Sequence, residues 1–66
     1  MQIVVNGESR QVAAAMTVAQ LLAELNIPAR GVAVEVNLQI VPRARHAEQC
    51  LQPGDRLEVV SLVGGG

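Results

Sequence analysis

Three glycines end the sequence, and their residue type suggests a chemical role before any other feature does. The run SLVGGG closes a strand-like segment with Gly64, Gly65 and Gly66. Glycine loses more conformational entropy on ordering than any other residue, so these positions add nothing to a folded core. A peptide without Cβ atoms can instead enter a narrow channel and place its last carbonyl beside a reactant. Residues 63–66 would reach about 14 Å when extended.

The carboxylate of Gly66 is the reactive group of such a tail. An α-carboxyl group is ionised at neutral pH and is a poor electrophile, so it needs activation before a nucleophile can be attached. Attack of the carboxylate on the α-phosphate of ATP would give an acyl-adenylate. The sequence contains no glycine-rich phosphate loop. We therefore expect no bound cofactor, with ATP and Mg²⁺ used by an activating partner, and a chain that is a substrate rather than an enzyme.

Other side chains with reactive groups lack the neighbours that chemistry requires. Cys50 is the single cysteine, which excludes an internal disulfide and a thiolate metal site; we interpret it as an inert, partly buried thiol rather than a sulfur relay. His46 is expected to be a solvated loop residue, without a catalytic triad or metal ligands. Arg43 and Arg45 are interpreted as a solvated pair, and docking to an acidic partner surface is the alternative.

Composition excludes several classes of function. The 66 residues carry six acidic side chains against five basic ones and no Phe, Tyr or Trp, so the charge and stacking groups of a nucleic-acid binder are missing. No apolar run approaches the roughly 18 to 20 residues of a membrane span, and the segment MQIVVNGES lacks the features of a signal peptide. We expect one small cytoplasmic domain without nucleic-acid or membrane partners.

Hydrophobic periodicity predicts several strands. Asn6-Gly7 is a strong two-residue hairpin signal because both positions tolerate positive φ, and Pro53-Gly54 suits the centre of a type II turn. The segment GVAVEVN alternates apolar and other residues in the pattern of a strand with one buried face. Strands are predicted at residues 2–5, 8–13, 31–37, 38–42 and 56–63. Residues 43–52 are polar and are expected to form a loop or a short helical turn over one end of the core.

One helix is predicted between the first two strands and the rest. Thr17 is a suitable N-cap and Gln20 can complete a capping box, while Met16 can pack onto Leu21 as a hydrophobic staple. Pro28 is expected to close the helix. Its apolar stripe consists of Val18, Leu21, Leu22 and Leu25.

The order of elements predicts an α+β fold in which the helix covers a mixed sheet. If the first strand lies centrally and the last strand lies beside it, the chain end projects from a rigid sheet. Strand alternation places Leu57 and Val59 toward the core, with Glu58, Val60 and Leu62 facing outward. Two exposed apolar side chains close to the tail indicate a docking surface for a partner.

The sequence also resembles the ThiS family of sulfur carrier proteins, over nearly the whole chain. The most specific stretch is residues 37–43, within VAVEVNLQIVPR. The others are MQIVVNGE, MTVAQLLAEL and PGDRLEVVSLVGGG. The resemblance implies a ubiquitin-like β-grasp fold, with a mixed sheet of four to five strands, one main helix on one face, a domain at residues 1–63 and a flexible glycine tail at 64–66.

For function, the resemblance implies sulfur transfer in thiamin biosynthesis. A ThiF-like enzyme would adenylate Gly66, sulfur from a persulfide would convert it to a thiocarboxylate, and a ThiG-like thiazole synthase would receive the sulfur. Gly65 and Gly64 would thread the tail into these enzymes. Two alternatives remain open: a MoaD-type carrier for molybdopterin synthesis, which shares the terminal glycines, and a β-grasp interaction module without covalent chemistry.

Overall fold

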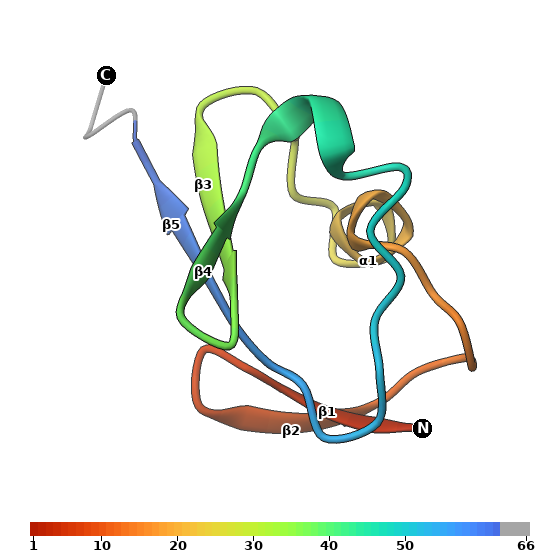
Figure 1. Cartoon of the computed structure of the whole chain (residues 1–66). Helices are drawn as coiled ribbons and strands as arrows, with labels where there is room; N and C mark the ends of the chain where they lie inside the picture. Colours follow the sequence, from red (N-terminus) through yellow and green to blue (C-terminus); the bar gives the residue numbers. More distant parts are fainter. Residues whose placement is uncertain (63–66) are drawn as a thin grey trace.

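The computed structural model describes residues 1–62 as a five-stranded sheet with one α-helix (Figure 1). In chain order the elements are β1 (Gln2–Val5), β2 (Glu8–Gln11), α1 (Val18–Glu24), β3 (Val32–Val36), β4 (Gln39–Val41), the 3₁₀ turn η1 (Arg43–Arg45) and β5 (Arg56–Ser61). All five predicted strands and the helix are confirmed. The second strand ends at Gln11 rather than at residue 13, although the Val12 amide still donates to the Met1 carbonyl at 2.8 Å.

The sheet has the strand order β2-β1-β5-β3-β4 and is mixed. β1 and β5 run parallel, whereas the other neighbours are antiparallel. The sheet curves around α1, which lies on its concave side (Figure 1). The last strand is therefore the central one, with the first strand beside it, and the predicted mixed β-grasp topology is confirmed.

The hydrophobic core formed by residues 1–62 lies between the sheet and α1 and consists of aliphatic side chains and methionine. Alternating residues of the strands supply one half, and the helix with its flanking loops supplies the other. Its buried members are Ile3, Val5, Val12, Met16, Val18, Leu21, Leu22, Val34, Val36, Val41, Leu51 and Leu57. Each removes apolar surface from water, which stabilises the fold by about 25 cal/mol per Å².

Both ends of α1 are capped by local hydrogen bonds. Gln20 N donates to Thr17 Oγ1 at 3.1 Å, and Thr17 N donates to Gln20 Oε1 at 2.9 Å, so the predicted capping box is present. At the other end Asn26 has a φ of 59°. The Ile27 amide donates to the Leu22 carbonyl at 2.8 Å, the bond that defines a Schellman motif. Asn26 therefore ends the helix before Pro28 is reached.

The segment after β4 corrects two predictions. His46 is only 3% exposed, not solvated, because η1 turns the chain back toward α1. Its Nε2 lies 3.0 Å from the Val41 carbonyl, and its own carbonyl accepts from the Ala19 amide at 2.9 Å. Cys50 is exposed rather than partly buried. It pairs with Thr17 in an isolated bridge, and its neighbour Leu51 takes the core position. Arg43 and Arg45 are exposed, as predicted.

Asn6 extends the sheet beyond the end of β1. Its backbone amide donates to the Leu57 carbonyl at 2.9 Å. Its side chain then takes the place of a further strand residue, because Oδ1 accepts from the Val59 amide at 2.9 Å and Nδ2 donates to the Val59 carbonyl at 3.3 Å. Asn6 also adopts a positive φ of 50° in the β1–β2 turn, which asparagine tolerates better than most residues. One residue thus closes the hairpin and holds β5.

Replacing Asn6 separates these two roles. Asn6→Gly keeps the turn geometry but loses both side-chain bonds to Val59, and we expect a loss of about 1 kcal/mol of unfolding free energy. Asn6→Ala loses the same bonds and adds the strain of a positive φ, which costs about 1 kcal/mol more. Thermal melting measures both, and hydrogen exchange of the Val59 amide should accelerate in each variant. Asn6→Gly with unchanged stability and an equally protected Val59 amide would refute the role of the side chain.

Candidate functional site

The strand that precedes the glycines is held in the sheet to its end. β3 pairs with β5 in register from Val36 opposite Leu57 to Val32 opposite Ser61. Beyond this ladder the Leu62 amide donates to the Gly31 carbonyl at 2.7 Å. Residues 63–66, which include the predicted site residues Gly64, Gly65 and Gly66, lie outside the described residues.

The predicted orientation of β5 is confirmed. Leu57 is 1% exposed and Val59 packs partly against the core. Glu58 is exposed, as are Val60 at 54% and Leu62 at 66%. The outward residues of β5 therefore lie on the side of the sheet away from α1, where a partner could contact them.

Two further exposed apolar residues, which the sequence analysis did not single out, lie near β5. Leu38, in the β3–β4 turn, is 87% exposed, and Ile40, in β4, is 61% exposed. Ile40 pairs with Glu35, which in turn pairs with Glu58 of β5. Strand alternation therefore puts Ile40 on the same side as Val60. The alternation of LQIVP contained this signal for Ile40.

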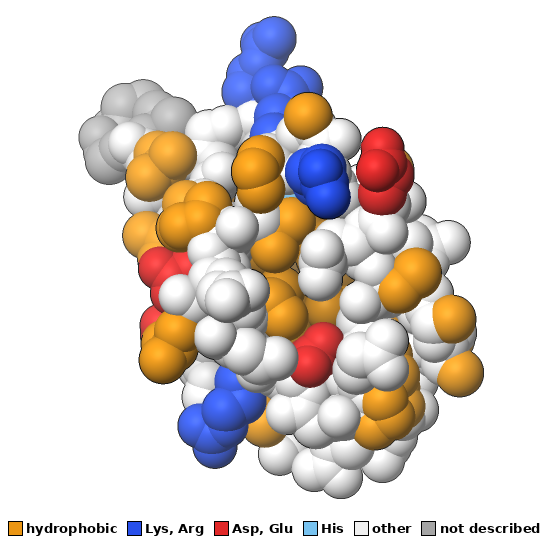
Figure 2. Space-filling view, in the orientation of Figure 1, with side chains coloured by type: hydrophobic (Ala, Val, Ile, Leu, Met, Phe, Trp, Pro, Cys, Tyr) orange, Lys and Arg blue, Asp and Glu red, His pale blue; other side chains and the backbone are white. Residues whose placement is uncertain are grey.

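We refer to Leu38, Ile40, Val60 and Leu62 as the outer face. Figure 2 shows hydrophobic side chains along the left margin of the molecule, over β4 and β5, with acidic side chains among them. Singly exposed apolar residues are ordinary on protein surfaces, whereas apolar residues gathered on one face mark interaction sites. The outer face thus has the character of a docking surface.

Two acidic residues of this side lie directly opposite each other. Glu35 of β3 and Glu58 of β5 are cross-strand partners, so both side chains project from the outer side of the sheet. Directly opposed residues of an antiparallel pair have Cβ atoms about 5 Å apart, and like charges in this arrangement destabilise a sheet. The pair concentrates negative charge between apolar side chains.

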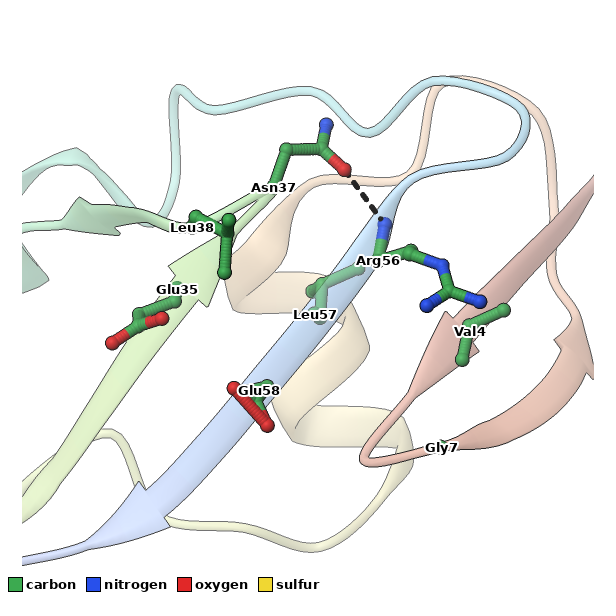
Figure 3. A pocket seen from close by; sticks show the side chains of 8 residues that line it. All are labelled: Val4, Gly7, Glu35, Asn37, Leu38, Arg56, Leu57 and Glu58. Atoms are coloured by element: carbon green, nitrogen blue, oxygen red, sulfur yellow. Dashed lines mark hydrogen bonds between the residues drawn. The ribbon is translucent and has the colours of Figure 1, made fainter.

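A hollow of about 500 Å³ lies beside this acidic pair. We call it the outer hollow. Its lining comprises Val4, Gly7, Glu35, Asn37, Leu38, Arg56, Leu57 and Glu58. Figure 3 shows the Arg56 side chain extending toward Val4 and β1, while the two carboxylates lie on the other side of the hollow.

Asn37 and Asp55 fix the turn that borders the outer hollow. Asn37 Oδ1 accepts from the Arg56 amide at 3.0 Å (Figure 3), and Asn37 Nδ2 donates to Asp55 Oδ1 at 2.9 Å. The other carboxylate oxygen of Asp55, which is buried, accepts from the Gln52 amide at 2.8 Å. The two side chains therefore tie the β3–β4 turn to the loop that enters β5.

Leu38 occupies a backbone conformation that suits glycine. Its φ is 69°, next to Asn37 at 51°, so both central residues of the two-residue β3–β4 loop have positive φ. Asn-Gly is the favoured pair for such a turn, and a leucine at the second position is strained. An exposed, strained leucine gives nothing to the core, which points to a role outside it.

The described residues contain neither a metal-binding cluster nor a membrane-spanning helix. Among residues 1–62 no group of three or more His, Cys, Asp or Glu side chains could hold a metal ion. No helix within the same range is long and apolar enough to cross a membrane.

The strained backbone at Leu38 predicts that glycine at this position stabilises the fold. Leu38→Gly should raise the unfolding free energy by about 1 kcal/mol, because glycine adopts positive φ without a steric penalty. In a domain of this size the melting temperature should rise by about 4–8 °C. Leu38→Ala is the matched control, since it removes the side chain but keeps the strain, and its melting temperature should stay close to that of the parent. A glycine variant no more stable than the alanine variant would contradict the assignment of strain.

Known proteins match this chain over its whole length. It is 39% identical to the sulfur carrier protein ThiS of Escherichia coli, with 100% of both chains covered. The crystal structure of the thiamine biosynthesis protein ThiS from Geobacter metallireducens superposes with a TM-score of 0.87 at 32% identity, again over 100% of both chains.

Longer proteins carry a related segment. The chain is 50% identical to a thiazole synthase of Paramagnetospirillum magneticum and 39% identical to one of Magnetococcus marinus, in each case over all 66 residues. It spans only 20% of the length of each of these two relatives. A sequence model of the ThiS family matches residues 3–66. With this match and the shared β-grasp structure, the chain belongs to the ThiS family.

Proposed function

We propose that this protein carries sulfur for thiazole formation in thiamin biosynthesis, with the Gly66 carboxylate as the group that is adenylated and converted to a thiocarboxylate. The observation that carries the proposal is the match to the E. coli sulfur carrier protein ThiS along both complete chains. The two thiazole synthases that contain a related segment support thiazole formation as the destination of the sulfur. These relatives favour the thiamin pathway over the molybdopterin alternative.

The anchoring of β5 supports delivery by a tail. Leu62 is hydrogen-bonded to Gly31, so the last described residue is still held by the sheet, and the proposal assigns delivery to residues 63–66. Their extended length of about 14 Å would allow Gly66 to enter a buried site while the folded body stays outside. We therefore retain residues 1–63 as the domain and 64–66 as the functional tail.

The proposed chemistry proceeds in three steps, each in a partner enzyme. A ThiF-like enzyme binds ATP and Mg²⁺, and the Gly66 carboxylate oxygen bonds to the α-phosphorus as pyrophosphate leaves. The terminal sulfur of a persulfide then attacks the acyl carbon and displaces AMP. A thiol cleaves the resulting S–S bond and leaves the thiocarboxylate, whose sulfur a ThiG-like synthase uses. Persulfides and free thiols fit a reducing cytoplasm, where we place the protein.

Intact mass measurement tests the function directly. The protein is incubated with ATP, Mg²⁺, the cognate adenylating enzyme and a sulfur donor, and the expected product has one oxygen replaced by sulfur at Gly66. Omission of ATP is the control. An unchanged mass under the complete conditions would favour the interaction module without covalent chemistry.

The tail itself is tested by Gly65→Val. A β-branched side chain next to the reacting carboxylate should hinder entry into a narrow channel, and we expect ATP–pyrophosphate exchange to fall by about 10²-fold or more. The melting temperature should not change. Ala23→Val, on the exposed side of α1, adds the same side chain away from the tail and should leave exchange unaltered. Normal exchange with Gly65→Val would remove the tail from the mechanism.

The outer face is tested by Val60→Asp and Leu62→Asp. Both side chains are more than half exposed, so the fold should persist. Binding to the adenylating enzyme should weaken by about 2 kcal/mol if either side chain fills an interface pocket. Calorimetric titration measures the affinity, with Ala23→Asp as the control for an added charge elsewhere. Unaltered affinity for both variants would exclude the outer face from this interface.

A further inference from the structure

The outer hollow combines negative charge with apolar walls, and the proposed tail chemistry uses neither. We infer that it receives an arginine side chain of the thiazole synthase, so that this guanidinium lies against Glu35 and Glu58 when the carrier docks. The inference rests on the proposed function for the identity of the partner. The arrangement of the hollow is what specifies the arginine.

The negative charge of Glu35 and Glu58 would be neutralised best by a cation from a partner. Glu35 and Glu58 face each other across the β3–β5 ladder at a cost to the sheet. Arg56 is the basic residue of the lining, yet its side chain runs toward Val4, away from both carboxylates (Figure 3). A cation that approaches from the partner would offset the repulsion between the two glutamates, so complementarity is gained only in the complex.

The walls of the hollow suit a long side chain rather than a small ion. Val4 and the strained Leu38 supply the apolar side chains that border the site. The methylene groups of an arginine can pack against such apolar surface while the charged end reaches the acidic pair. Leu38, which is 87% exposed, would thus pack against the methylene groups of the bound arginine.

The paired carboxylates favour arginine over lysine. Two carboxylates on neighbouring strands offer four acceptor oxygens, and a guanidinium presents five N–H donors in a planar fork. An ammonium group is more strongly hydrated and acts as a point charge, so it loses more on entering a partly enclosed site. Arginine is also enriched at protein interfaces, where lysine is depleted.

The position of the hollow links it to delivery of the tail. Glu58 lies in β5 two residues before Val60 and four before Leu62, and all three project from the same side of the sheet. A synthase that takes up residues 63–66 and covers the outer face would therefore also reach the hollow. The arginine would fix the angle at which β5 directs the tail into the synthase.

The double variant Glu35→Gln/Glu58→Gln tests the inference. Its affinity for the cognate thiazole synthase is measured by calorimetric titration at low and high salt, next to the parent and to Glu24→Gln, which removes an exposed charge from α1. We expect the double variant to bind at least tenfold more weakly and to lose most of the salt dependence, whereas Glu24→Gln binds like the parent. The double variant should melt at or above the parent temperature because the repulsion is gone.

A second measurement identifies the cation. Phenylglyoxal modifies arginine side chains, and peptide mass mapping of the synthase should show one arginine that is protected by the parent carrier but not by the double variant. Protection of lysines from acetylation, with no arginine protected, would overturn the choice of arginine.

Other outcomes would overturn the docking itself. The double variant could bind the synthase as tightly as the parent does, or Glu24→Gln could lose as much affinity as the double variant. The double variant could also lose affinity for the adenylating enzyme but not for the synthase. Finally, the parent could form a dimer that the double variant does not form. Conversion of the parent to the thiocarboxylate is scored separately by intact mass. If the parent is converted normally and the double variant binds the synthase as tightly as the parent does, the inferred arginine contact in the outer hollow is refuted. The proposed function is then unaffected.

Discussion

The pairing of β5 with strands on both sides is the interaction on which the rest of this structure depends. β5 lies between the β1–β2 hairpin and the β3–β4 hairpin. In the sheet described for residues 1–62, it is the one strand that pairs with both hairpins. Its inward residue Leu57 is among the most deeply buried in the core. Side-chain amides complete this arrangement where the backbone ladder ends. Asn6 pairs with Val59 on one side, and Asn37 accepts from the Arg56 amide on the other.

This central position separates the two tasks of the strand. The side toward α1 is filled by aliphatic groups that stabilise the fold, while the outward side is free to carry residues that a partner would select. Costs to stability accumulate on that outward side: opposed glutamates at 35 and 58, a leucine at positive φ, and apolar side chains in water. A 66-residue domain has a small stability margin, so such costs are retained most readily where they serve binding.

Most of the fold could be predicted from the sequence because its signals are local. The capping box at Thr17 and Gln20, the Asn6-Gly7 turn and the alternation around Val34 each depend on residues only a few positions apart. His46 was predicted wrongly because its burial depends on contacts with β4 and α1 that no local pattern encodes. Cys50 was predicted wrongly for a related reason, since the pairing of this segment with Thr17 is a contact between residues far apart in the sequence.

The candidate site was predictable only in part, for a physical reason. Strand alternation is sufficient to turn Glu58, Val60 and Leu62 outward, but it says nothing about which residue of another strand lies beside them. The pairing of Glu35 with Glu58 depends on the β3–β5 register, and that register is fixed by burial of Val34 and Val36 on the opposite side of the same strand. A slip of one residue would bury Glu35. Burial of Val34 and Val36 in the core therefore determines which charged side chains lie together at the outer hollow.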